Sequence, residues 1–174
     1  MLKNLSNFNH LDDYFPIVVA ALIVDMFILL RMVFGYINIK SLNHWYNRFG
    51  FLAVIADVLS IVIGIIISRF LYPFIFKEYS LYYFLILICI VQITHDLSFA
   101  FFFNSIPKGN SDIIDVFKDY AKEVGATILL ADALMMVSTI ILASYIATFK
   151  TNYIIILFII SLNILPYLLY SIKK

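Results

Sequence analysis

The chain has 174 residues, of which 64% are hydrophobic and 13% charged, and its formal net charge is +1. A soluble domain could not bury that much apolar surface, and apolar runs of about twenty residues are typical of membrane spans. The small net charge excludes a basic surface for nucleic acid, and the single cysteine, Cys89, excludes disulfides within the chain and cysteine-based zinc sites. The sequence therefore predicts an integral membrane protein that binds no nucleic acid.

Apolar runs along the chain predict an all-α bundle of five transmembrane helices, forming a single domain over residues 1–174. The first run is too long for the core of a signal peptide and is expected to remain as a span. In the polar connection that follows (residues 38–47), Trp45 and Tyr46 are expected at the level of the lipid headgroups. The second span is expected to stop at Pro73. The predicted spans are residues 14–36, 49–72, 81–103, 126–149 and 153–170.

Between the third and fourth spans, the turn Pro107-Lys108-Gly109-Asn110 leads to a short amphipathic helix over residues 112–124. Asp112 is expected to cap this helix and Gly125 to end it. The helix is expected to lie in the membrane interface, either as a solvated lead-in to the next span or as a surface that docks an unknown protein partner. The docking residues would be Asp115, Lys118, Asp119 and Lys122.

The distribution of Lys and Arg predicts which way the bundle is inserted. Five spans place the termini on opposite sides of the membrane, and most of the twelve basic residues fall on the side of the C-terminus. These are Arg31, Lys40, Arg48, Lys108, Lys118, Lys122, Lys173 and Lys174. The positive-inside rule therefore places the N-terminus outside or in a lumen and the C-terminus in the cytoplasm. The expected partners are the lipid bilayer and, as an open alternative, further copies of this chain.

Four of the predicted spans each contain one aspartate, and these are Asp25, Asp57, Asp96 and Asp132. An ionisable residue inside a spanning helix is costly, so it usually faces a protein interior or a water-filled cavity and marks a candidate functional site. Depth is counted from the span ends on the side of the membrane that holds the C-terminus. By this count the four carboxylates fall in one layer, roughly 9–17 Å deep. Small residues at helical spacing, from Ala53 through Gly64 to Ser68, predict that the face of the second span carrying Asp57 packs against another helix.

Several carboxylates in one apolar site must share protons, bind a cation or pair with a basic side chain. The first interpretation is a proton or cation channel or transporter, in which the four aspartates and Gln92 bind the ion. The second is a non-transporting scaffold, in which protonated aspartates form inter-helix hydrogen bonds worth about 0.6–2 kcal/mol each. Membrane-embedded catalysis by aspartates or a metal is a third alternative, although no catalytic residue or cofactor is assigned and the chain is not expected to be an enzyme. A bound cation could involve His95, with Asp57, Asp96 and Asp132 as further ligands.

The sequence also resembles a group of viral proteins. It is rich in Ile, Phe, Tyr, Asn and Lys, and contains Gln92-Ile-Thr-His-Asp96 and the Pro107 turn leading into Asp115-Val-Phe-Lys-Asp119-Tyr. Over about residues 45–150 these features resemble uncharacterised small multispan membrane proteins of large DNA viruses that infect algae and protists. The resemblance implies a host membrane or a membrane inside the virion as the location, and either a viral channel or a structural membrane component as the function.

Overall fold

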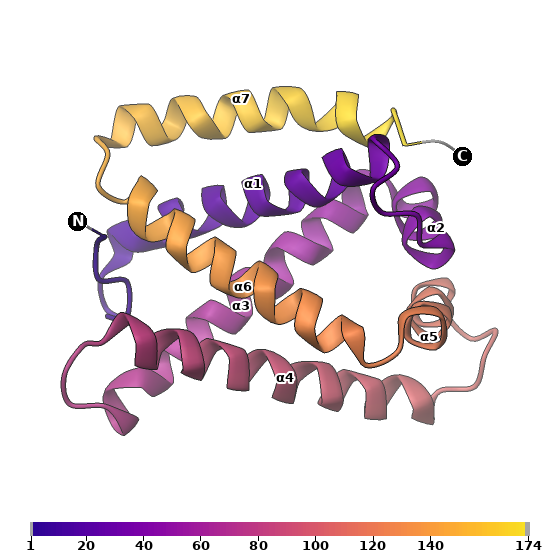
Figure 1. Ribbon diagram of the computed structural model, residues 1–174, viewed down its shortest axis with the longest axis horizontal. Coiled ribbons are helices and arrows are strands. Elements are labelled where there is room, and N and C mark those ends of the chain that lie inside the picture. Colours follow the sequence, from indigo (N-terminus) through magenta and orange to yellow (C-terminus); the bar gives the residue numbers. More distant parts are fainter. Residues whose placement is uncertain (1, 173–174) are drawn as a thin grey trace.

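The computed structural model describes residues 2–172 and is entirely helical in its regular structure over that range (Figure 1). A 3-10 helix, η1 (Leu11–Asp13), precedes α1 (Tyr14–Val33), α2 (Lys40–Phe49), α3 (Phe51–Ile75), α4 (Leu81–Ser105), α5 (Asp112–Val124), α6 (Thr127–Ile146) and α7 (Thr151–Leu169). Five helices, α1 with η1, α3, α4, α6 and α7, are long and apolar enough to cross a membrane. The predicted all-α class with five spans is confirmed, and these helices mark the chain as an integral membrane protein.

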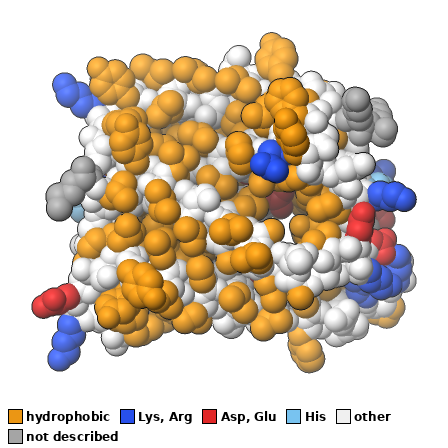
Figure 2. Space-filling view, in the orientation of Figure 1, with side chains coloured by type: hydrophobic (Ala, Val, Ile, Leu, Met, Phe, Trp, Pro, Cys, Tyr) orange, Lys and Arg blue, Asp and Glu red, His pale blue; other side chains and the backbone are white. Residues whose placement is uncertain are grey.

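The spanning helices pack around α1 and α6. Helix α1 contacts α3, α6 and α7, while α4 packs against α3 and α6 on the other side of the bundle. In Figure 1, α3 and α6 cross in the middle, with α7 along one edge and α4 along the other. Apolar side chains cover most of the middle of the face seen in Figure 2, and most charged side chains gather at its two ends. This distribution is the one that a surrounding lipid bilayer requires.

Small residues allow the central helices to approach closely. Ala53, Gly64 and Ser68 of α3 are buried, as are Thr139 and Ala143 of α6. A Cβ atom added to Gly64 would lie 2.8 Å from the Cε atom of Met136 on α6, closer than two carbon atoms tolerate. The small-residue face predicted for the second span therefore does point into the bundle.

The structure corrects the expected connection between the first two spans. Residues 38–47 were predicted to be a polar connection, but Lys40–Phe49 forms the amphipathic helix α2. Its Trp45 and Tyr46 side chains are only 4% and 3% exposed, so they point into the protein and not toward lipid headgroups. The span boundaries shift by a few residues, and Pro73 lies inside α3, which ends at Ile75. Pro73 removes the amide donor to the backbone carbonyl of Arg69, and the helix continues for only two residues beyond it.

Candidate functional site

Two short helices cover one end of the bundle. Helices α2 and α5 lie beside each other at the end where α1 and α4 finish and α3 and α6 begin, here named the α2–α5 end (Figure 1). They run antiparallel, because Arg48 near the end of α2 pairs with Asp112 at the start of α5 (2.9 Å), while Glu123 at the end of α5 binds the start of α2. The cap of α5 also differs from the prediction: Ser111, and not Asp112, accepts the hydrogen bond from the backbone of Ile114.

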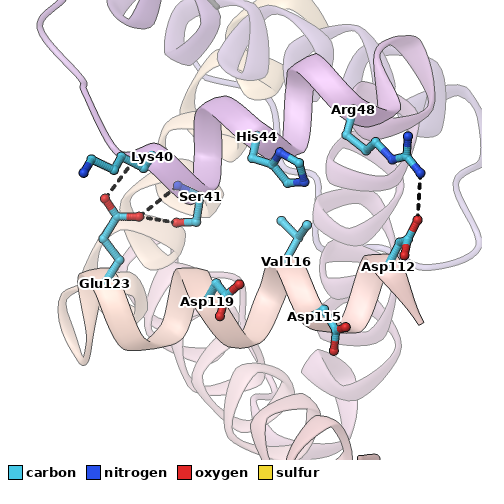
Figure 3. Close-up of a pocket in the computed structure, with 9 residues that line it drawn as sticks. All are labelled: Lys40, Ser41, His44, Arg48, Asp112, Asp115, Val116, Asp119 and Glu123. Carbon is cyan, nitrogen blue, oxygen red and sulfur yellow. Dashed lines mark hydrogen bonds and ion pairs between the residues drawn. The ribbon is translucent and has the colours of Figure 1, made fainter. Parts of the chain in front are cut away.

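Between α2 and α5 lies a polar cavity of about 540 Å³ with walls of opposite charge (Figure 3). Basic side chains at four-residue spacing, Lys40, His44 and Arg48, come from α2. The facing wall of α5 carries only acidic groups and one apolar residue. These are Asp112, Asp115, Val116, Asp119 and Glu123. Complementary charge across the cavity favours the pairing of the two helices and keeps polar groups at the α2–α5 end.

Glu123 supplies the cap that α2 lacks in its own sequence. The residue before α2, Ile39, makes no side-chain cap, so the first amide groups of the helix need an outside acceptor. One oxygen of Glu123 accepts from the backbone of Lys40 (2.8 Å), and the other accepts from the backbone (2.8 Å) and hydroxyl (2.6 Å) of Ser41. These hydrogen bonds, with the nearby Lys40 charge, lower the pKa of Glu123 below its ordinary value of 4.5. Helix α5 therefore holds the start of α2 in place.

Replacing Glu123 with glutamine is expected to loosen α2, and the fluorescence of Trp45, the only tryptophan, reports it. The pKa of Glu123 is lower in the folded protein than in the unfolded chain. The ionised Glu123 side chain therefore stabilises the folded protein at pH values above its pKa in the unfolded chain, and this stabilisation is lost as the pH falls through its pKa in the folded protein. We expect Trp45 emission of Glu123→Gln to be red-shifted at neutral pH, and the wild type to approach it on acidification. Glu78→Gln, an exposed change between α3 and α4, is the control. Unchanged emission in Glu123→Gln would contradict this assignment.

Facing the bundle interior, α2 binds two of the four intramembrane aspartates. The Tyr46 hydroxyl lies 3.1 Å from Oδ1 of Asp25 and 2.8 Å from Oδ2 of Asp57. The indole Nε1 of Trp45 donates to the same Asp57 oxygen (3.0 Å). Asp25 is fully buried, and its Oδ2 atom has no hydrogen-bond partner among the described residues. Aspartates of α1 and α3, far apart in the sequence, are thus joined through one phenol.

The other two aspartates lie on α4 and α6 at a similar level. The amide of Gln92 donates to Asp96 (2.7 Å), as their four-residue spacing predicts, and Nδ1 of His95 lies 3.2 Å from the same oxygen. Burial, together with the negative charges of Asp132, Asp57, Asp96 and Glu123, raises the pKa of Tyr120 on α5 to about 12. Three of the aspartates therefore lie within electrostatic range of one hydroxyl.

The helix ends show that the four aspartates share one level of the bundle. Asp25 and Asp96 lie eight and nine residues before the ends of α1 and α4, and Asp57 and Asp132 lie six and five residues after the starts of α3 and α6. At 1.5 Å per residue they are roughly 8–14 Å from the α2–α5 end. Because neighbouring spans alternate in direction, the structure brings together the layer that the sequence predicted. Binding of an ion there stays a prediction.

Two further sets of predicted residues have definite positions. Within residues 2–172, no three His, Cys, Asp or Glu side chains are grouped so that they could hold a metal ion, and His95 packs against Phe99 with 4.4 Å between ring centroids. A cation held with His95 stays a prediction.

Three of the four predicted docking residues make contacts within the chain: Asp115 accepts from the Gly109 backbone (2.8 Å), Lys118 donates to the Ile106 carbonyl, and Asp119 binds Lys108 (2.7 Å).

The opposite end of the bundle holds a separate buried ion pair. Arg69 of α3 is fully buried; it donates to the backbone carbonyls of Asn7 and His10 and lies 3.3 Å from Asp13. Asp13 also pairs with Lys3 (2.8 Å). The guanidinium lies over the ring of Tyr14. Arg69 is therefore bound to Asp13 and the N-terminal segment and does not neutralise the four aspartates.

Sequence reasoning missed Trp45 and Tyr46, the donors that contact the aspartates. The signal that could have found them is the four-residue spacing of Lys40, His44 and Arg48, which predicts a short helix with a polar face and places the two aromatic residues away from it. The site thus combines buried carboxyl groups with neutral donors from a helix outside the spans. Comparisons of the chain with protein-family models, with curated proteins and with solved structures found no match, so the resemblance to viral membrane proteins stays a prediction.

Proposed function

We propose that this integral membrane protein carries protons or small cations across the bilayer, using the layer of Asp25, Asp57, Asp96 and Asp132 with Gln92 as its binding site. The observation that carries the proposal is the gathering of four carboxyl groups from four spanning helices at one level. Each acidic side chain in a spanning segment costs free energy, and Asn or Ser could make inter-helix hydrogen bonds at a smaller cost. No catalytic residue and no cofactor are part of this proposal.

Polar groups on both sides of the layer support a pathway. Toward the α2–α5 end lie the Tyr120 hydroxyl and the polar cavity between α2 and α5. Toward the other end, Ser68, Thr139 and Ser144 are buried in the bundle, and the Ser144 hydroxyl has no partner among the described residues. Hydroxyl groups in a membrane interior are suited to relaying protons or to holding water. In the orientation given by the positive-inside rule, the aspartate layer lies in the cytoplasmic half of the membrane.

Flux from purified protein in liposomes tests the proposal. With imposed proton, sodium and potassium gradients, the wild type is expected to dissipate at least one gradient, and Asp57→Asn and Asp132→Asn are expected to abolish that flux while remaining folded. Asp12→Asn, an exposed change in η1 outside the layer, is the matched control and should conduct like the wild type. If no gradient dissipates faster than in empty liposomes, the proposal fails.

A second candidate function is a non-transporting membrane scaffold, which one specific observation favours. Asp25 of α1 and Asp57 of α3 form hydrogen bonds with Tyr46 and Trp45 of α2, and such inter-helix hydrogen bonds are what a scaffold requires. Under this function the asparagine variants show no flux difference and lose only about 0.6–2 kcal/mol of stability per site. The liposome experiment, combined with unfolding midpoints of the same variants, distinguishes the two functions.

A further inference from the structure

The hydroxyl of Tyr46 has fewer hydrogen atoms than the contacts around it require. It lies within hydrogen-bond distance of two carboxyl oxygens, from Asp25 (3.1 Å) and Asp57 (2.8 Å), yet a phenol carries one hydrogen. Burial and the two nearby carboxylates raise the pKa of Tyr46 well above its ordinary value, so that hydrogen stays on the phenol at neutral pH. One hydrogen cannot serve two ionised acceptors. One of the two bonds must therefore be donated by a protonated carboxyl group.

The environments of the two carboxyl groups decide which one is protonated. Oδ2 of Asp57 accepts from Tyr46 and also from the indole of Trp45, which can only donate. Two donors on one oxygen favour an ionised Asp57. Asp25 is fully buried, and its Oδ2 atom has no partner among the described residues, so an ionised Asp25 would leave a buried negative charge with little compensation. The proton therefore belongs on Asp25, whose Oδ1 donates to the Tyr46 oxygen.

We infer that Asp25, Tyr46 and Asp57 form a proton-binding triad in which Asp25 holds the proton, and that the ion carried by this protein is the proton. The second half of this inference rests on the proposed transport function. The first half does not depend on it, because the count of hydrogen atoms holds for a scaffold as well. Tyr46 thereby gains a role as the positioning and relay residue between two spanning helices.

The triad provides a balanced transfer step. The Asp25 O–H bond breaks as that proton forms a bond with the Tyr46 oxygen, and the original Tyr46 O–H bond breaks as its proton passes to Oδ2 of Asp57. Asp25 ends ionised, Asp57 ends protonated, and Tyr46 remains a neutral phenol throughout. No electron is transferred, and no further reactant is needed. The proton thus moves from the most deeply buried carboxyl group to one that is partly exposed and lies closer to Asp132, Asp96 and Tyr120.

Charged and titratable groups of the helices packed around the triad are mainly acidic. Asp132 comes from α6, Asp96 and His95 from α4, and Tyr120 from α5. Helix α7, Thr151–Leu169, contains no acidic or basic side chain. On α1 itself, Arg31 is exposed and lies against the rings of Phe27 and Tyr36, away from the triad. A shared proton is therefore the available compensation for the paired carboxyl groups.

Infrared spectroscopy of the full chain in phosphatidylcholine nanodiscs tests the bound proton directly. At neutral pH the wild type is expected to show the carbonyl stretch of a protonated carboxylic acid, and the difference spectrum against Asp25→Asn isolates the Asp25 part of that band. Tyr46→Phe, which keeps the ring and removes the hydroxyl, should shift the Asp25 band, whereas Tyr36→Phe, at an exposed tyrosine, should leave it unchanged. A wild type without the band, or an unchanged band in Asp25→Asn and Tyr46→Phe, overturns the inference.

Proton flux in liposomes tests the second half with the same variants. Tyr46→Phe is expected to reduce proton flux about tenfold or more, because the hydrogen-bonded link is lost, while Tyr36→Phe conducts normally. If the infrared band is present but no gradient dissipates, the bound proton on Asp25 is supported and the transport function is rejected. If sodium or potassium flux is measured in a protein that lacks the infrared band, transport is supported but the proton is not the ion that is carried. Since Tyr46→Phe preserves the packed ring, it remains informative if Asp25→Asn fails to fold.

Discussion

Replacing Arg69 with methionine is expected to destabilise the folded protein by about 3–5 kcal/mol, because it breaks the buried ion pair with Asp13 and leaves only partners from the N-terminal segment on that carboxylate. Arg69 and Asp13 are 0% and 1% exposed, so water cannot replace the lost guanidinium. The backbone carbonyls of Asn7 and His10 would lose the guanidinium donor in the same step, and each would keep one backbone hydrogen bond (3.3 Å). Unfolding midpoints in detergent measure the loss, and proteolysis of the N-terminal segment should accelerate, since Arg69 connects that segment to α3.

The matched control is Arg31→Met, at an exposed arginine of α1 whose guanidinium makes cation–π contacts with Phe27 and Tyr36, and we expect it to lower the free energy of unfolding by about 0.5–1 kcal/mol. The double variant Arg69→Met with Asp13→Asn removes both charges and should recover part of the stability lost by Arg69→Met alone. Equal midpoints for Arg69→Met and Arg31→Met would show that the buried pair does not hold this end of the bundle together.

Replacing Trp45 with alanine is expected to cost about 3–5 kcal/mol, the range for deleting a buried tryptophan. The indole is 4% exposed, packs with ring centroids 4.9 Å from both Phe49 and Phe117, and donates to Asp57. Its removal separates α2 from α5 and takes one of two donors from the Asp57 carboxylate. Chemical unfolding measures the stability, and amide hydrogen exchange in residues 40–49 and 112–124 measures the loosening of the two helices.

Trp45→Phe separates packing from hydrogen bonding at this position. It retains an aromatic ring between Phe49 and Phe117 but lacks the indole donor. We therefore expect the free energy of unfolding to fall by about 1.5–3 kcal/mol, the range for losing a hydrogen bond to a charged group. Phe34→Ala, at an aromatic residue that is 68% exposed, should change the unfolding midpoint little in detergent. If Trp45→Ala were no more destabilising than Phe34→Ala, α2 would not be anchored through this side chain.

Local patterns predicted the parts of the fold that depend on local composition. The spans follow from run length and apolar content, because a bilayer sets both within a single helix. Residues 112–124 form a helix ending at Gly125 as predicted, since their apolar spacing and the glycine act within a few residues. Helix α2 escaped prediction although its basic residues recur at four-residue spacing, because its own sequence supplies no cap and its first turn is capped by Glu123, a residue more than eighty positions away.

Within the site, the sequence by itself determined that four aspartates share a level, because a constant rise per residue converts sequence position into depth along each span. Only the tertiary structure decided that Asp25 and Asp57 meet at the Tyr46 hydroxyl and that Arg69 binds Asp13. Depth is a property of one helix. Contact depends on how each helix is rotated and which helices are its neighbours, and these are fixed by packing among segments distant in the chain.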